Sequence, residues 1–321
     1  MKKIKIVTSG KSYFDIDGYA CCIAYAELIN FLNGAGAAIP FTSAPFNYSV
    51  SKSVIDLGKK IETPKTFTPG PDAECIVMDV SDPRFFDPIT EGKSIVEIFD
   101  HHVGFENYWQ EKLGAKSKIE FMGCAATLIF EEWEKAKLVS QMSPETAKIL
   151  TAAILDNTLN LIADVTSQRD ITAQKMLCKI GKISEEWCEK FFIECQEEIE
   201  RDLISAIRKD AKNDCNVPNL PQGIGQLTLW DAQKLLQKRD EIYKAMETVS
   251  SVWMINIISI KNKKSYFVCN NEEARNKLQK IFAVKFDNDI AILNKAMLRK
   301  EIIKQAKNTE SFASSQDGFA K

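Results

Sequence analysis

Both histidines of this 321-residue chain stand side by side, as His101 and His102, directly after Asp100. The apolar and β-branched run "SIVEIF" leads into them, which is typical of a buried strand. Because neighbouring residues of a strand point to opposite faces, two histidines buried in a core would need two separate partners. A functional site therefore explains the pair better than a purely structural role does.

Carboxylates follow other apolar segments of the chain. Asp15 and Asp17 lie in the loop after a strand expected at 4–7, Asp79 ends the apolar run "CIVM", and Asp156 interrupts the apolar sequence "AAIL". In an open parallel sheet, ligands bind beyond the carboxyl ends of the strands, so we expect these side chains to meet the histidines at one edge. Carboxylate oxygens together with imidazole suit a divalent ion such as Mn²⁺ or Mg²⁺.

Each carboxylate also has a simpler explanation. Asp15 and Asp17 could form turns or cap a helix, and Asp79 could cap the element that follows it. Asp156 could form a hydrogen bond with backbone inside a core, since a buried carboxylate needs a partner. The set as a whole is more specific than any one of its members.

The pattern of apolar residues predicts an α/β fold with a mostly parallel sheet and flanking helices, followed by a smaller α/β C-terminal domain. We expect strands at 4–7, 75–79, 95–102 and 223–229, a hairpin at 252–270 that turns near 262–263, and helices at 18–32, 123–136, 143–159 and 272–282. The predicted domains are 1–194 and 200–307, and the polar segment 308–321 is expected to be disordered.

Composition excludes several classes of protein. The net charge of -2 gives no sign of a nucleic-acid-binding surface. No apolar run reaches the roughly 18 residues that span a bilayer. The nine cysteines are odd in number and no pair has C-x-x-C spacing, which favours free thiols in a reducing compartment. We expect a cytoplasmic protein without membrane or nucleic-acid partners, and a homodimer is left open.

The motifs resemble those of the DHH phosphoesterase superfamily, and within it the family II (manganese-dependent) inorganic pyrophosphatases with a DHHA2 C-terminal domain. The four motifs are D-x-D at Asp15 and Asp17, the aspartate Asp79, Asp-His-His at 100–102, and the helical Asp156. Four further segments are similar to that family, namely "EFMGCAATLIFEEW", "AIRKDAKND", "GIGQLTL" and "AMLRKEIIKQ".

The resemblance implies a role for each matching residue. Asp15 would bind a first metal ion, Asp79 would bridge two ions, and the second ion would be held by Asp17, His101 and Asp156. The ions would be Mn²⁺, or Mg²⁺ or Co²⁺, one or two in number.

The substrate would be held by other matching residues. His102 would contact a phosphate or assist proton transfer, and Asp100 would orient an imidazole. The phosphate would be bound by Lys212, Arg299 and Lys300. Without the resemblance, these three cations would be taken for solvated surface residues.

The sequence departs from the family pattern at Lys11, where the family has a histidine that binds the first metal. A protonated lysine offers no lone pair to a metal. Tyr13, Phe14 and Gly18 also replace usual family residues. Either the first metal binds weakly, or Lys11 supplies positive charge in its place, or Lys11 contacts the phosphate of a different substrate.

The implied function is metal-dependent hydrolysis of phosphoanhydride bonds in pyrophosphate or short-chain polyphosphate, as in inorganic pyrophosphatases and exopolyphosphatases. Two alternatives stay open. One is a DHH phosphodiesterase acting on oligonucleotides or cyclic dinucleotides. The other is a non-catalytic sensor of a phosphate ligand whose first metal site has degraded at Lys11.

Overall fold

The structure, a computed structural model, describes residues 3–213, 215–217 and 219–316, with side chains up to Thr309. The chain divides into two compact units. The first contains Met1–Leu161 and Val165–Glu194, and the second contains Ile162–Asp164 and Cys195–Lys321.

The first unit is built on a parallel five-stranded sheet with strand order β2-β1-β3-β4-β5. Its strands are β1 (Lys5–Thr8), β2 (Ala38–Pro40), β3 (Glu74–Met78), β4 (Ile95–Asp100) and β5 (Ser117–Ile119). The central strands β1, β3 and β4 are buried and rich in Ile and Val, as expected for a parallel sheet covered on both faces.

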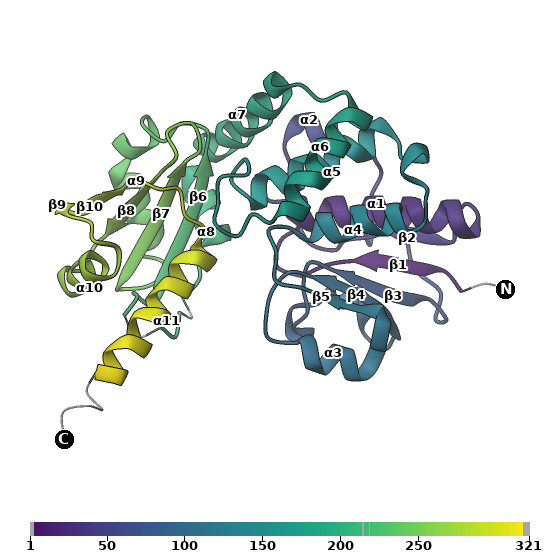
Figure 1. The fold of residues 1–321 in the computed structure, drawn as a ribbon, viewed down its shortest axis with the longest axis horizontal. Helices are drawn as coiled ribbons and strands as arrows, with labels where there is room; N and C mark the ends of the chain where they lie inside the picture. Colours follow the sequence, from purple (N-terminus) through teal and green to yellow (C-terminus); the bar gives the residue numbers. More distant parts are fainter. Residues whose placement is uncertain (1–2, 214, 218, 317–321) are drawn as a thin grey trace. The chain divides into compact units, whose positions relative to one another are not determined.

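Helices cover both faces of this sheet, with α1 and α4 on one side and α3 on the other (Figure 1). Helices α5 and α6 pack against each other, and α5 also packs against α1. The helices are α1 (Ile16–Asn33), α2 (Lys52–Ile55), α3 (Glu106–Leu113), α4 (Ala125–Lys135), α5 (Pro144–Asn157), α6 (Gln168–Gly181) and α7 (Glu185–Arg201), which runs from the first unit into the second.

The second unit contains a mixed five-stranded sheet with strand order β6-β7-β8-β10-β9. Strands β6 and β7 are parallel and the other neighbours are antiparallel. The elements are α8 (Leu203–Asp210), β6 (Gly223–Leu229), α9 (Arg239–Met246), β7 (Trp253–Ser259), β8 (Lys264–Cys269), α10 (Glu272–Phe282), β9 (Phe286–Asp287), β10 (Ile290–Leu293) and α11 (Arg299–Gln316).

The predicted α/β fold is confirmed, as are the hairpin turn near 262–263 and the start of α5, where the Ser143 side chain accepts a hydrogen bond from the Thr146 amide. One detail was wrong, because β4 ends at Asp100 and both histidines lie beyond it. In the segment 308–321, α11 continues as a helix to Gln316, and residues 317–321 lie outside the described part.

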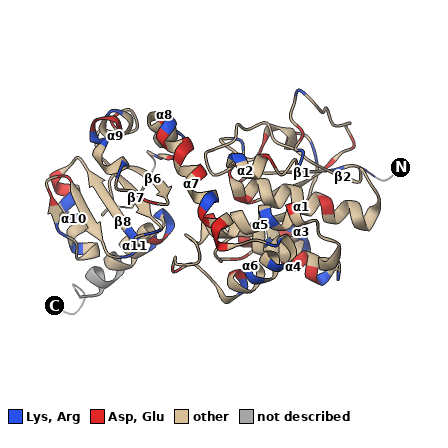
Figure 2. Ribbon diagram, turned by 90° about the horizontal axis from the view of Figure 1, so that it is seen from above, with Lys and Arg blue, Asp and Glu red and all other residues tan. Residues whose placement is uncertain are grey.

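No helix among the described residues is both long and apolar enough to cross a membrane. Basic and acidic residues both occur on the helices of each unit (Figure 2), which agrees with the small net charge of the chain.

Candidate metal centre

The candidate site lies beyond the carboxyl ends of three neighbouring parallel strands. β1 pairs with β3, and β3 pairs with β4 in a register that sets Met78 opposite Phe99. Asp79 and Asp100 therefore emerge next to each other at the same edge. The loop after β1 leads to Asp15 at the N-cap of α1, close to the same place.

Asp79 has an unusual backbone conformation directly after β3. Its φ is 57°, in the left-handed region that few residues other than glycine adopt, although aspartate does so more readily than most. Its amide donates a hydrogen bond of 2.7 Å to the Phe99 carbonyl of β4, which holds the turn in place. Backbone strain of this kind is common at functional sites, where surrounding contacts enforce it.

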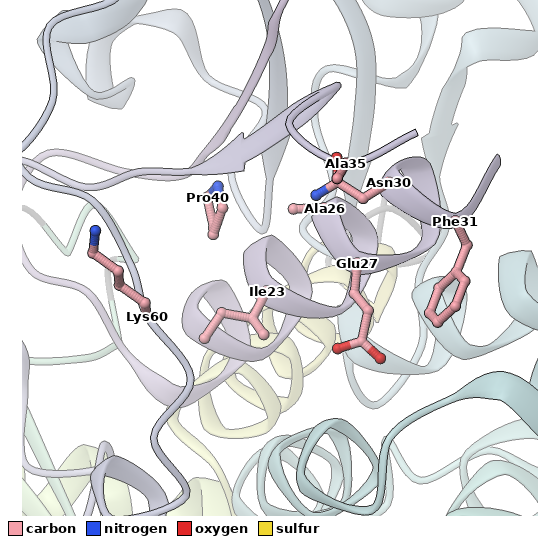
Figure 3. Close-up of a pocket in the computed structure, with 8 residues that line it drawn as sticks. All are labelled: Ile23, Ala26, Glu27, Asn30, Phe31, Ala35, Pro40 and Lys60. Carbon is pink, nitrogen blue, oxygen red and sulfur yellow. The ribbon is translucent and has the colours of Figure 1, made fainter. Parts of the chain in front are cut away.

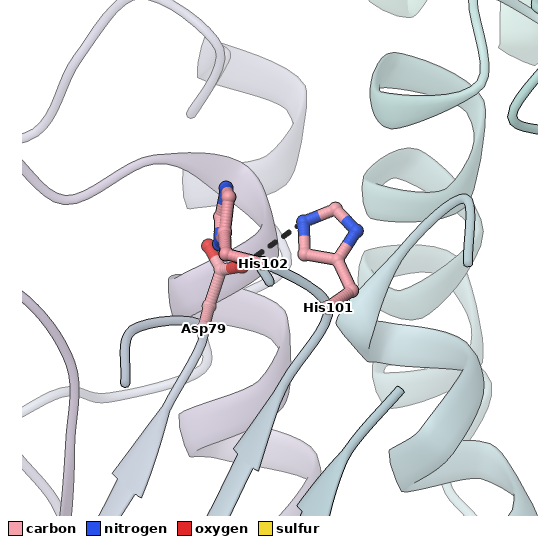
Figure 4. Close-up of side chains that lie close together, drawn as sticks. All are labelled: Asp79, His101 and His102. Carbon is pink, nitrogen blue, oxygen red and sulfur yellow. Dashed lines mark ion pairs between the residues drawn. The ribbon is translucent and has the colours of Figure 1, made fainter. Parts of the chain in front are cut away.

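Asp79, His101 and His102 form a compact group whose potential ligand atoms all lie within 4.8 Å of one another (Figure 4). His101 is buried, and its Nε2 lies 3.3 Å from Asp79 Oδ1 and 3.7 Å from Asp17 Oδ2. Its Nδ1 lies 3.2 Å from the Met122 carbonyl oxygen. An Nδ1–H that donates to this carbonyl leaves the Nε2 lone pair facing the two carboxylates.

This arrangement fits a divalent cation. A lone pair and two carboxylates that face one another repel unless a proton or a cation lies among them. Two ligands at right angles around an ion with bonds of about 2.1 Å are about 3 Å apart, close to the observed spacing of 3.3 Å between His101 Nε2 and Asp79 Oδ1. A backbone carbonyl behind the second ring nitrogen is also the usual support of a metal-binding histidine.

Asp17 is held by the start of helix α4. Its two carboxylate oxygens accept hydrogen bonds from the amides of Ala125 (3.0 Å) and Ala126 (2.9 Å). The thiol of Cys21 also lies 3.4 Å from Oδ1. Burial, and after it the nearby charge of Asp15, raises the pKa of Asp17 to about 6.

Asp15 also accepts a hydrogen bond from a backbone amide and has a raised pKa. Its side chain accepts a hydrogen bond of 3.0 Å from the Gly18 amide and so caps α1, as the simpler explanation from the sequence allowed. Burial raises the pKa of Asp15, while contacts with Gly18, His102 and Asp79 partly offset the increase. A cluster of carboxylates with raised pKa values gains from a cation that neutralises them.

Asp100 orients the exposed histidine of the pair. Its Oδ1 accepts hydrogen bonds from the His101 amide (2.8 Å), the His102 amide (3.1 Å) and His102 Nδ1 (2.8 Å). The His102 side chain is 59% exposed, whereas Asp100 is buried. With Nδ1–H bound to Asp100, the His102 Nε2 carries the lone pair.

Two further predicted residues occupy less central positions. Asp156 lies in the last turn of α5, is half-buried, and does not belong to the group of three in Figure 4. Lys11 is exposed, and its amide donates a hydrogen bond of 2.9 Å to the Phe85 carbonyl.

In the second unit, Arg299 is held in a polar network at the start of α11. Its guanidinium forms hydrogen bonds of 2.7 and 3.2 Å with the two carboxylate oxygens of Asp210, and both side chains are largely buried. The Arg299 amide donates to Gln226 Oε1 (2.5 Å), and the Gln226 amide donates to Asp210 (2.6 Å). Asp210 and Gln226 were not predicted as site residues, although both lie in segments that carry the family resemblance.

The other two predicted cations lie close in sequence to members of this network. Lys300 follows Arg299 in the first turn of α11 and is half-buried. Lys212 is exposed, and its backbone pairs with Ile224 of β6 through hydrogen bonds of 2.9 and 2.8 Å.

A separate pocket of about 350 Å³ is lined by residues of α1, among them Ile23, Glu27 and Phe31, together with Pro40 and Lys60 (Figure 3). None of the predicted site residues lines it. The Glu27 carboxylate is already bound by Lys59 (2.7 Å) and Thr146 (2.6 Å).

Fold and site together define a two-unit α/β protein with a candidate divalent-metal centre at the carboxyl edge of a parallel sheet. No family model matches the chain. It is 27% identical over 248 residues to the manganese-dependent inorganic pyrophosphatase of Methanocaldococcus jannaschii, covering 71% of this chain and 76% of that protein. It is 22% identical over 307 residues to the enzyme of the same name from Bacillus subtilis, covering 92% and 96%.

Solved structures agree at the level of the fold. A crystal structure from Methanococcus jannaschii, assigned to the family II inorganic pyrophosphatases, superposes with a TM-score of 0.66 at 22% identity, covering 95% of this chain and all of that one. An exopolyphosphatase-related protein from Bacteroides fragilis gives a TM-score of 0.51 at 12% identity, covering 96% and 91%. The predicted resemblance to the family II inorganic pyrophosphatases is confirmed.

Proposed function

We propose that the chain is a manganese-dependent hydrolase that cleaves the phosphoanhydride bond of pyrophosphate or short-chain polyphosphate. The observation that carries the proposal is His101, whose Nε2 faces Asp79 and Asp17 while its Nδ1 is held by a backbone carbonyl. The similarity to enzymes named manganese-dependent inorganic pyrophosphatases supports Mn²⁺ as the ion and pyrophosphate as the substrate.

Residues 1–194 would hold the metal in this proposal. Asp15 would bind one ion, Asp79 would be shared, and Asp17, His101 and Asp156 would bind a second. When bound, the metal supplies a water of lowered pKa as nucleophile and neutralises charge on the phosphate. The chain's part is to keep these ligands deprotonated and correctly oriented, for which Asp17 has the α4 amides and His101 has the Met122 carbonyl.

His102 would act on the substrate itself. Its Nδ1–H is held by Asp100, so that Nε2 is directed away from its support and can accept or donate a proton at a phosphate oxygen. Its exposure is consistent with contact to a bound molecule.

Residues 200–307 would supply cations for the phosphate groups through Arg299, Lys300 and Lys212. Asp210 keeps the Arg299 guanidinium in a fixed orientation, which suits two-pronged recognition of phosphate oxygens. Lys11 would add positive charge near Asp15, at the position where the family has a histidine. The nine free cysteines support a reducing, cytoplasmic location.

The test is phosphate release from pyrophosphate, tripolyphosphate and a dinucleotide, measured with Mn²⁺ and with Mg²⁺. We expect Mn²⁺-dependent release from pyrophosphate and a loss of at least 100-fold in Asp79→Ala, because removing a metal ligand disables water activation. Cleavage of the dinucleotide alone would indicate a phosphodiesterase instead. Mn²⁺ binding without release from any substrate would indicate a sensor and would refute the proposal.

A further inference from the structure

A buried carboxylate outside the predicted ligand set, Asp170, lies behind the metal centre. It is the third residue of helix α6 and is fully buried. With Ser167 it forms a capping box, in which the Ser167 hydroxyl accepts from the Asp170 amide and Asp170 Oδ2 accepts from the Ser167 amide at 2.7 Å. Capping accounts for only part of its contacts.

The remaining contacts of Asp170 reach Gly123, in the segment 122–126 at the start of helix α4, and Thr127, which directly follows this segment. Asp170 Oδ1 accepts a hydrogen bond of 2.6 Å from the Thr127 hydroxyl, and Oδ2 accepts one of 3.3 Å from the Gly123 amide. The approach at Gly123 is so close that a Cβ atom there would lie 2.5 Å from Asp170 Oδ2 and 2.8 Å from Thr158 Cγ2. Glycine is therefore required for the backbone to reach the carboxylate.

The same segment also holds two predicted metal ligands. The Met122 carbonyl lies 3.2 Å from His101 Nδ1. The amides of Ala125 and Ala126 donate to the two oxygens of Asp17. These ligands come from different elements, the start of α1 and the loop after β4, and segment 122–126 is in contact with both.

We propose that Asp170 is a positioning residue for the metal centre. It fixes the segment 122–126, whose backbone carbonyl at Met122 and amides at Ala125 and Ala126 orient His101 and Asp17. The inference rests on the proposed metal site, and it concerns affinity for the metal rather than the reaction. A carboxylate suits this role because its two oxygens accept several hydrogen bonds at once, here from Thr127, Gly123 and Ser167. A shift of the segment would move the supports of both ligands together.

The test is direct Mn²⁺ binding to the metal-free protein, measured by the electron paramagnetic resonance signal of the remaining free Mn²⁺. In Asp170→Asn an NH2 group replaces one carboxylate oxygen, so either the amides of Gly123 and Ser167 or the Thr127 hydroxyl lose their acceptor. We expect the dissociation constant for Mn²⁺ to rise about 10- to 100-fold, the range typical of residues that support metal ligands. The effect on kcat at saturating Mn²⁺ should be smaller than the effect on affinity.

Ser167→Ala is the matched control. It removes the hydroxyl that caps the same helix, together with the 2.7 Å bond that this hydroxyl donates to Asp170 Oδ2, but keeps the contacts of Asp170 with Gly123 and Thr127. It should lower the thermal midpoint by a few degrees and leave the Mn²⁺ dissociation constant within about twofold of wild type. A capping role alone would instead give both variants the same small change in affinity.

A second pair of variants keeps the test decisive if Asp170→Asn does not fold. Thr127→Val removes the hydroxyl donor with little change in volume and should weaken Mn²⁺ binding. Thr127→Ser keeps a hydroxyl at this position and should bind Mn²⁺ as tightly as the wild type. Wild-type affinity in Asp170→Asn or in Thr127→Val would overturn the inference, and so would a wild-type protein that does not bind Mn²⁺. A protein that binds Mn²⁺ but cleaves neither pyrophosphate nor tripolyphosphate would overturn the proposed function alone, because the comparison of affinities would still apply.

Discussion

The raised pKa of Asp17 predicts an unusual dependence of stability on pH for the metal-free protein. Burial and the nearby Asp15 raise this pKa from 3.8 to about 6 in the folded state. Between these values the folded protein binds more protons than the unfolded chain, so the free energy of unfolding rises as the pH falls. The loss of unfolding free energy caused by burying ionised Asp17 has its full size above pH 6 and vanishes below about pH 4.

The size of the effect follows from the shift. A change of about two pKa units corresponds to about 3 kcal/mol over the whole range, and about 1 kcal/mol of this is recovered between pH 7 and pH 5. The raised pKa of Asp15 acts in the same direction. Bound Mn²⁺ should reverse the trend, because the metal requires deprotonated ligands and stabilises the protein more at pH 7 than at pH 5.

The assay is urea unfolding at pH 5, 6 and 7 in the presence of EDTA, and again with Mn²⁺, for wild type and Asp17→Asn. Asparagine does not titrate, so the difference between the two proteins as a function of pH isolates this group. The variant also weakens the bonds from Ala125 and Ala126, which lowers its stability at every pH and cancels from the slope. Equal slopes in the two metal-free proteins would refute the reasoning.

Three further substitutions test other parts of the structure. Gly123→Ala should lower the free energy of unfolding by about 1–3 kcal/mol in urea, because its Cβ would lie 2.5 Å from Asp170 Oδ2; Gly70→Ala, with no atom within 4 Å of its Cβ, should have no measurable effect. Lys11→His should tighten Mn²⁺ binding by about tenfold in the same resonance assay, because imidazole offers a lone pair to the metal. Unchanged or weaker binding would show that Lys11 does not stand at the position of a metal ligand. Arg299→Lys should raise KM for pyrophosphate by about tenfold with a smaller change in kcat, because lysine cannot form the two-pronged contact; an unchanged KM would exclude this cation from phosphate binding.

The sequence was sufficient to predict the central strands and the residues that meet at their ends. β3 and β4 are apolar runs followed directly by acidic residues or histidine, and the rule that ligands bind beyond strand ends brings Asp79 and the histidine pair together. The short strands β2, β5, β9 and β10 were not predicted. Segments of two to four residues carry too few side chains to show a period, and tertiary pairing decides their conformation.

The supporting residues could not be predicted for a different reason. Ser167 and Asp170 have the spacing of a capping box, which indicates where a helix begins but not what else the carboxylate contacts. Gly123 and Thr127 lie far from Asp170 in the sequence, and only the packing of α4 against α6 brings them together. Similarly, the contact of Asp210 with Arg299 joins the ends of two helices that lie far apart along the chain.

The features that are unfavourable for folding gather where the metal is proposed to bind. Asp79 has a left-handed backbone, Asp17 is buried and Asp15 is half-buried, and both have raised pKa values. Such features persist only where surrounding contacts enforce them, and here the contacts are backbone groups that cannot turn away, such as the Phe99 carbonyl and the α4 amides. Ligands that are held in place before the ion arrives lose little conformational entropy when it binds. These features therefore lower the stability of the metal-free fold but increase its affinity for the cation.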